Sequence, residues 1–86
     1  MARAEDFETF VDARYAALAR TAVLLTGDRA TAEDLLQEAL IRTYATWRRV
    51  RDTGAAEGYV RTTMVRLLLR DRRRRWSGEI PHADVP

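Results

Sequence analysis

The residues of this sequence best suited to chemistry are arginines gathered toward its C-terminal end. Residues 66–75 contain six arginines and one acid, Asp71. Arginines one helical turn apart repel each other by about 0.2–0.5 kcal/mol per pair in water. One or two of them would be enough to complement the dipole at a helix end. Because guanidinium groups bind phosphates through paired hydrogen bonds, this density favours a polyanionic partner over water.

The spacing of this region also places different chemical groups on one helical face. Tyr59, Thr62, Arg66, Arg70 and Arg73 recur at steps of three and four residues. An aromatic ring, a hydroxyl and guanidinium groups are what binding sites for single-stranded nucleic acid use to stack bases and hold phosphates. The basic surface would extend through Arg48, Arg49, Arg51 and Arg61. A membrane is not an expected partner, because the apolar face of this helix is needed for the core.

Residues that could carry out catalysis are scarce. The single histidine, His82, lies in a segment with two prolines, and the sequence has no cysteine. Glu33, Asp34 and Glu38 cluster on one predicted helix, where acids usually complement the dipole. No metal-ligand spacing is present. We therefore predict a protein that is not an enzyme and that uses no metal, cofactor or small-molecule substrate.

Length and charge limit the architecture. The 86 residues suffice for one small domain. Residues 1–46 hold five arginines and eight acids, a net charge of −3, whereas residues 47–86 hold ten arginines and five acids, a net charge of +5. Such an asymmetry favours two surfaces with different partners. No signal peptide or membrane span is predicted, and the lack of cysteine is compatible with the cytoplasm, where we expect the protein.

The apolar residues recur with helical periodicity, which predicts the positions of the secondary-structure elements. A first helix is predicted over residues 7–25, ended by Gly27, and a second helix over residues 32–48, capped by Asp28 or by Thr31. Residues 49–58 are predicted as a loop, residues 56–74 as a third helix, and residues 77–86 as an extended tail. The expected fold is therefore all-α, a small three-helix bundle with an extended C-terminal tail.

The two later helices each have a predicted core face. For the second helix it comprises Ala32, Leu36, Ala39, Leu40, Thr43, Tyr44 and Trp47, and for the third Val60, Met64, Leu67 and Leu68, with Asp71 leaning inward as an ion-pair or cap partner. The opposite side of the second helix carries Ile41 among Asp34, Gln37, Glu38 and Arg48. By pattern alone an exposed isoleucine is ordinary, and the alternative is a docking site with an apolar centre and a polar rim.

Two stretches resemble a known family. "LLTGDRATAEDLLQEALIRTYATW" and "YVRTTMVRLLLRDRRRRWSGEIP" are similar to region 2 of bacterial extracytoplasmic-function sigma factors of the sigma-70 family, in particular to the actinobacterial SigE-like subgroup. The resemblance extends from about Phe7 to Pro86, and "AEDLLQEAL" is its most specific part. It implies a transcription initiation factor that contacts the clamp helices of the largest catalytic subunit of RNA polymerase core. The polymerase-binding residues implied are Asp34, Leu35, Gln37, Glu38 and Ile41.

The resemblance also implies binding to promoter DNA. In this family the loop and third helix recognise and melt the minus-ten element and hold its unpaired nontemplate strand, with one base in a loop pocket. That pocket would be formed by Arg51 to Glu57. The DNA-binding residues implied are Arg48, Arg49, Arg51, Asp52, Thr53, Tyr59, Arg61, Thr62, Arg66, Arg70 and Arg73. The family often has asparagine where this chain has Arg66, so base specificity at that position does not transfer.

The resemblance divides the chain into a helical region 2 domain, residues 1–76, and the start of an interdomain linker, residues 77–86. The family's second domain, which reads the minus-thirty-five element, is missing, and we expect a truncated chain. Two alternatives remain open. The chain could be a module bound mainly by an anti-sigma factor, or a nonspecific binder of single-stranded nucleic acid, for which the arginines alone would suffice.

Overall fold

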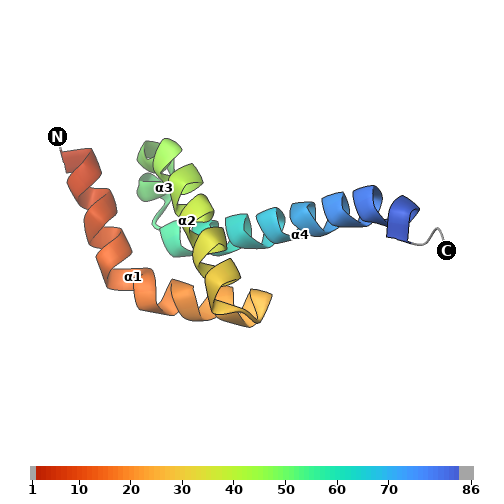
Figure 1. Cartoon of the computed structure of the whole chain (residues 1–86). Helices are drawn as coiled ribbons and strands as arrows, with labels where there is room; N and C mark the ends of the chain where they lie inside the picture. Colours follow the sequence, from red (N-terminus) through yellow and green to blue (C-terminus); the bar gives the residue numbers. More distant parts are fainter. Residues whose placement is uncertain (1, 84–86) are drawn as a thin grey trace.

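Residues 2–83 fold into four helices. The computed structural model describes the backbone of residues 2–83 and the side chains of residues 6–52 and 54–75. Helix α1 spans Ala2–Thr26, α2 Arg29–Ala45, α3 Trp47–Thr53 and α4 Ala56–Ala83 (Figure 1). No strand occurs in residues 2–83. The all-α prediction is confirmed, with a short fourth helix that was not predicted.

The turn between α1 and α2 follows the predicted signals. Gly27 adopts a φ of 78°, and its N–H donates to the Val23 carbonyl over 2.6 Å. A positive φ carries no steric penalty in glycine, so α1 ends here. The carboxylate of Asp28 then accepts from the Thr31 N–H at 2.8 Å and from the Thr31 hydroxyl at 2.6 Å. Of the two predicted caps, Asp28 is the one that starts α2.

Helix α2 lies between α1 and α4 and contributes most to the core. Three alanines with almost no exposed surface, Ala22, Ala32 and Ala39, let the helices approach closely. The larger buried side chains are Leu18 of α1, Leu35 and Leu36 of α2, and Val60, Met64 and Leu67 of α4. The predicted core face of α4 is therefore confirmed at these three α4 positions. Tyr44, predicted to be buried, is instead 44% exposed.

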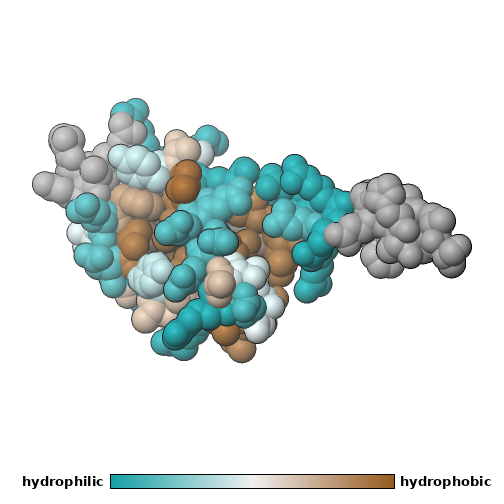
Figure 2. Space-filling model, viewed as in Figure 1, coloured by the Kyte–Doolittle hydropathy of each residue, from teal (hydrophilic) through white to brown (hydrophobic). Residues whose placement is uncertain are grey.

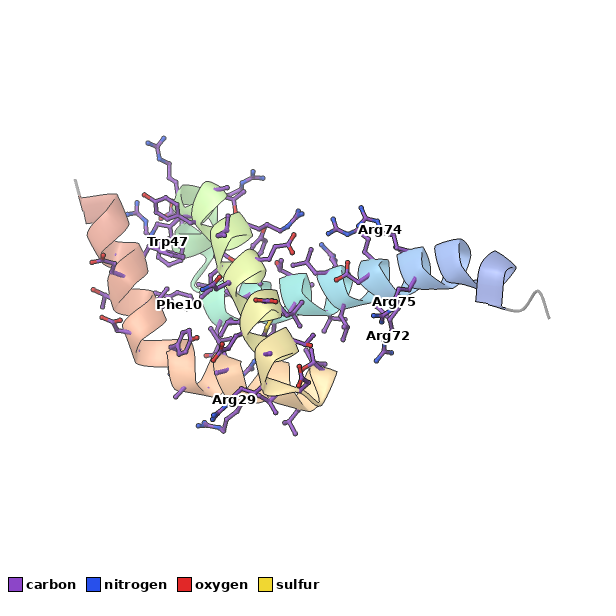
Figure 3. The ribbon with its side chains drawn as sticks, in the orientation of Figure 1. Phe10, Arg29, Trp47, Arg72, Arg74 and Arg75 are labelled. Atoms are coloured by element: carbon purple, nitrogen blue, oxygen red, sulfur yellow. The ribbon has the colours of Figure 1, made fainter. Side chains whose placement is uncertain are left out.

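An aromatic cluster attaches the N-terminal half of α1 to the junction of α2 and α3. The ring of Phe7 lies 4.9 Å from that of Tyr44 and 5.1 Å from that of Trp47, and Phe10 lies 5.3 Å from Trp47. Phe10 and Trp47 both lie between α1 and the top of α2 (Figure 3). Trp47 is only 4% exposed, so this contact fixes the position of α3, which Trp47 begins.

The predicted loop over residues 49–58 is wrong, because most of it is helical. Helix α2 ends at Ala45, before the predicted end near Arg48, and Thr46 has a non-helical φ of −117° and ψ of 23°. Helix α3 then runs to Thr53 and is ended by Gly54, whose φ is 72°. Arginine is a good helix former, and burial of Trp47 and Val50 gives this short helix an apolar face. Only Gly54 and Ala55 connect α3 to α4.

Helix α4 is longer than predicted. It continues past Trp76, where an extended tail was expected, to Ala83, and residues 84–86 lie outside the described part. Its C-terminal half extends away from the other helices (Figure 1). Asp71 is exposed and does not lean into a core. None of the described helices is both long enough and apolar enough to cross a membrane.

The packing of the core predicts that two leucines of α4 contribute very differently to the free energy of unfolding. Leu67 is 5% exposed and Leu69 is 47% exposed. Leu67→Ala should lower the free energy of unfolding by about 2–5 kcal/mol, because it removes buried methyl groups and leaves a cavity. Leu69→Ala is the matched control and should change it by about 0.5 kcal/mol or less. Urea titration followed by circular dichroism measures both, and equal losses would contradict this packing.

The Asp28 cap predicts a pH dependence. Hydrogen bonds from the side chain and then the backbone of Thr31 lower the pKa of Asp28 below its ordinary value of 3.8. Ionised Asp28 therefore stabilises the fold above that value, and the contribution is lost as pH falls through the lowered pKa. Asp28→Ala should lower the melting temperature most at neutral pH, with the difference from wild type shrinking as the pH falls below 3.8. A difference that stays constant over this range would exclude the charged cap.

Candidate functional site

The exposed side of α2 forms one candidate surface. Asp34 and Gln37 are exposed, Glu38 is half-buried, and Ile41 is 68% exposed. Ile41 borders an open groove of about 510 Å³ between α1 and α2, whose other lining residues are Phe7, Glu8, Gln37, Leu40 and Tyr44. Leu35, predicted to belong to this surface, is instead buried in the core at 7% exposure. The surface therefore has an apolar floor and a rim of Glu8 and Gln37.

Sequence reasoning missed four residues of this surface, Phe7, Glu8, Leu40 and Tyr44. Phe7 and Glu8 come from α1, and their proximity to Ile41 depends on how the two helices cross. Leu40 and Tyr44 follow the helical period of the core face and were predicted to be buried, but Leu40 is only partly buried and Tyr44 is 44% exposed. No signal in the sequence alone shows that these side chains line a surface groove and do not belong to the core.

A second candidate surface lies where α3 meets α4. An open groove of about 560 Å³ is lined by Thr46, Arg49, Val50, Ala55, Gly58, Tyr59 and Thr62. The Thr46 hydroxyl donates to the Tyr59 hydroxyl over 3.4 Å, which orients the ring. Gly58 has no neighbouring heavy atom within 4 Å of where a Cβ would stand, so this side of α4 is open. Of residues 51–57, which were predicted to form a base pocket, Ala55 lines this groove.

An adjoining groove of about 410 Å³ separates the end of α2 from α4. Its lining residues are Arg42, Ala45, Thr46, Tyr59, Thr63, Arg66, Leu67 and Arg70. Because both grooves are lined by Thr46 and Tyr59, the Tyr59 ring stands between them. We call the two together the Tyr59 grooves.

The predicted DNA-binding arginines divide into paired and unpaired groups. Arg51 lies 2.9 Å from Asp6 and 3.3 Å from Asp52, Arg61 lies 2.8 Å from Glu57, and Arg70 lies 3.6 Å from Glu38. Hydrogen bonds to Asp6 and then Asp52 raise the pKa of Arg51 further above its ordinary value. Within the described side chains, no ion pair involves Arg48, Arg49, Arg66 or Arg73. Among the predicted DNA-binding arginines, these four are the most available to an external anion.

The structure does not bring all predicted DNA-binding residues together. Arg49, Tyr59, Thr62, Arg66 and Arg70 line the Tyr59 grooves. The Asp52 carboxylate is occupied by Arg51, and the side chain of Thr53 lies outside the described residues. Arg73 belongs to the projecting part of α4.

The projecting part of α4 is basic around its circumference. Arg72, Arg73, Arg74 and Arg75 are all exposed. Arg74 lies on one side of the helix axis and Arg72 and Arg75 on the other (Figure 3). The hydrophilic surface continues along this segment as far as the described atoms reach (Figure 2). This part therefore offers positive charge in several directions, not a single stripe.

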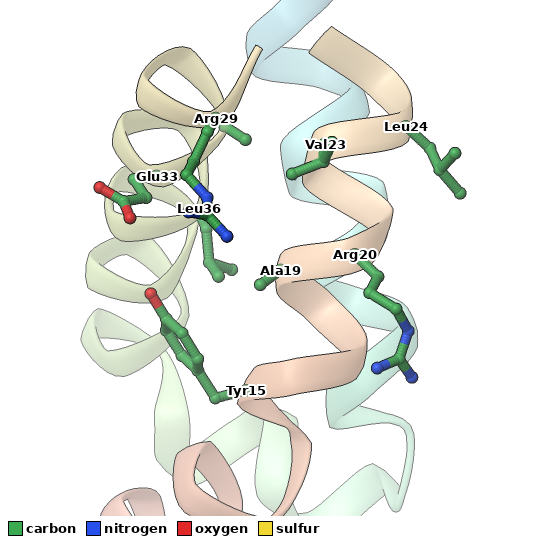
Figure 4. A pocket seen from close by; sticks show the side chains of 9 residues that line it. Tyr15, Ala19, Arg20, Val23, Leu24, Arg29, Glu33 and Leu36 are labelled. Carbon is green, nitrogen blue, oxygen red and sulfur yellow. The ribbon is translucent and has the colours of Figure 1, made fainter. Parts of the chain in front are cut away.

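A fourth groove, of about 500 Å³, lies between α1 and α2 and contains no predicted site residue. Tyr15, Ala19 and Val23 of α1 face Leu36 of α2 across it (Figure 4). Leu24, at its edge, is 85% exposed. Across the described residues, no group of three or more histidine or acidic side chains could hold a metal ion.

Comparison with known proteins identifies a family and several relatives of this chain. The profile of the family described as Sigma-70 region 2 matches residues 10–78. The chain is 38% identical over 81 residues to an RNA polymerase sigma-E factor of Streptomyces coelicolor, covering 94% of this chain and 46% of that protein. It is 39% identical to the proteins of the same name from Streptomyces avermitilis and Streptomyces antibioticus, covering 94% of this chain and 45% of each.

The chain thus spans about half the length of these relatives. No solved structure matches it. The matched residues include all of α2 and α3 and every residue that lines the Tyr59 grooves, whereas Phe7 and Glu8 of the α2 surface precede them. The chain belongs to the sigma-70 family, as a region 2 domain related to the RNA polymerase sigma-E factors of Streptomyces.

Proposed function

We propose that this domain binds RNA polymerase core through the exposed side of α2 and holds the unpaired nontemplate strand of a promoter minus-ten element in the Tyr59 grooves. It acts in transcription initiation by binding and melting, without catalysis of its own. Membership of the sigma-70 region 2 family supports the general role. The division of roles between the two surfaces is supported by their different chemistry.

The α2 surface suits a protein partner. Ile41 is 68% exposed beside a groove whose floor includes Phe7 and Leu40. An apolar centre within a polar rim is the usual composition of a protein interface. Helices of a coiled coil, which the resemblance names as the partner, present side chains that can fill such a groove.

The Tyr59 grooves suit a single strand. Base stacking on an aromatic side chain contributes about 1–3 kcal/mol per base, and removing a base from its duplex costs a few kcal/mol. Tyr59 is 37% exposed, with Arg49 in one adjoining groove and Arg66 in the other. A stacking ring with cations on both sides is the observation that carries the proposal. It offers a base platform together with contacts for the phosphates that flank the base.

The domain boundary at residue 76 and the role of residues 77–86 as the start of a linker stay predictions. So does binding by an anti-sigma factor, which would cover the same surfaces.

If the α2 surface binds RNA polymerase, a substitution at its apolar centre should weaken polymerase binding specifically. Ile41→Arg places a charge over the apolar floor and should weaken capture of Streptomyces RNA polymerase core by about tenfold or more. Leu24→Arg is the matched control, because Leu24 is more exposed and lies away from this groove. Biolayer interferometry with immobilised domain measures both. Equal binding by the Ile41 variant and wild type would exclude this surface.

If the strand binds in the Tyr59 grooves, substitutions there should change both the affinity for a single strand and the preference for its sequence. Tyr59→Ala should weaken binding of a labelled minus-ten-like single strand by about fivefold to 150-fold, the equivalent of one lost stacking contact. Tyr59→Phe keeps the ring and should stay close to wild type. Gly58→Leu fills open space and should abolish the preference for this strand over a scrambled one.

Fluorescence anisotropy at fixed salt distinguishes the alternatives. If wild type binds both strands equally and Tyr59→Ala changes neither, the arginines alone bind nucleic acid and the domain is a nonspecific binder. Circular dichroism of each variant confirms that the helices are retained.

A further inference from the structure

We propose that Arg42, Arg66 and Arg70 together hold one phosphate of the unpaired strand, and that the Glu38 carboxylate occupies this site in the free protein. The inference rests on the proposed strand binding. It adds Arg42, which neither the pattern of the sequence nor the family resemblance assigned to DNA, and gives Glu38 a role on the DNA side.

The three guanidinium groups converge from two helices. Arg42 comes from the last turn of α2, and Arg66 and Arg70 lie one turn apart on α4. All three line the same groove of about 410 Å³, with Tyr59 and Thr63. A phosphate there would lie beside the ring proposed to stack a base, as the phosphate of a stacked nucleotide must.

Glu38 already acts as an internal anion for this cluster. Its Oε2 atom lies 3.1 Å from Nη2 of Arg42 and 3.6 Å from Nη2 of Arg70. It also accepts from Nε of Arg42 over 3.4 Å. Three guanidinium groups against one carboxylate leave two positive charges uncompensated in the cluster. Repulsion between Arg66 and Arg70 therefore persists in the free protein and favours a second anion.

The contacts of Arg70 are incomplete in this arrangement. Its Nε atom is buried and has no hydrogen-bond partner, and its contact with Glu38 is longer than that of Arg42. A charged donor without an acceptor is unfavourable. A phosphate brings several acceptor oxygens, whereas Glu38 shares one oxygen between two arginines. Exchange of Glu38 for a phosphate would let Arg70 reorient and complete its hydrogen bonds.

The test measures binding of labelled oligothymidylate, which reports phosphate contacts without the minus-ten sequence. Arg42→Ala and Arg66→Ala should each weaken binding about threefold to tenfold and flatten its salt dependence. Because both arginines serve one phosphate, the double variant should lower the salt slope by about 0.7 in total. A total near 1.4 would mean two separate phosphates and would overturn the shared site. Arg29→Ala, on the far part of α2, is the matched control.

Substitution of Glu38 tests independently whether its carboxylate occupies the phosphate site. Glu38→Gln removes the internal anion and should tighten oligothymidylate binding by about 1.5-fold to fivefold, the usual range for loss of an exposed ion pair. Glu33→Gln removes the same charge from α2 but outside this groove. If the two variants tighten binding equally, the effect is general charge and Glu38 does not occupy the site.

These outcomes are distinct from failure of the proposed function. If Arg42→Ala binds as wild type while Tyr59→Ala is weakened, the strand still binds in the Tyr59 grooves and the phosphate site is wrong. If wild type binds no single strand, the proposed function itself fails.

Discussion

The packing of α2 between α1 and α4 is the constraint on which both surfaces depend. Ala22, Ala32 and Ala39 have almost no exposed surface, so the helices approach closely and their positions are fixed by side-chain contact. With one side of α2 committed to the core, its remaining side carries Gln37 and Ile41. The same packing places the end of α2 against α4 and so creates the grooves beside Tyr59. A loss of core packing would therefore disturb both surfaces together.

The two surfaces are joined through a carboxylate. Glu38 lies next to Gln37 in the sequence, yet it contacts Arg42 and Arg70 on the side of the Tyr59 grooves. The charge asymmetry of the sequence suggested two separate surfaces with different partners. The structure instead shows them meeting along one edge of α2, where the acid of one surface partly neutralises the arginines of the other.

How much the sequence predicts differs between core and surface. Periodicity placed Leu36, Val60 and Met64 in the core, and Gly27 with Asp28 marked the turn, because these features depend on local spacing and capping. Helix α3 was missed because its seven residues are too few for a period, and the glycine beyond it resembled a loop signal. The ion pairs of Arg51, Arg61 and Arg70 were also missed. Those of Arg51 and Arg70 join separate helices, so helical spacing does not predict them.

The central claim is that an opened strand lies along the junction of α3 and α4, on both sides of Tyr59. The most direct measurement is a titration of the ¹⁵N-labelled domain with a minus-ten-like single strand, followed by amide chemical shifts. The largest changes should occur at Thr46, Tyr59, Thr62 and Thr63. Changes confined to the groove between Tyr15 and Leu36, or to Arg72 through Arg75, would contradict it.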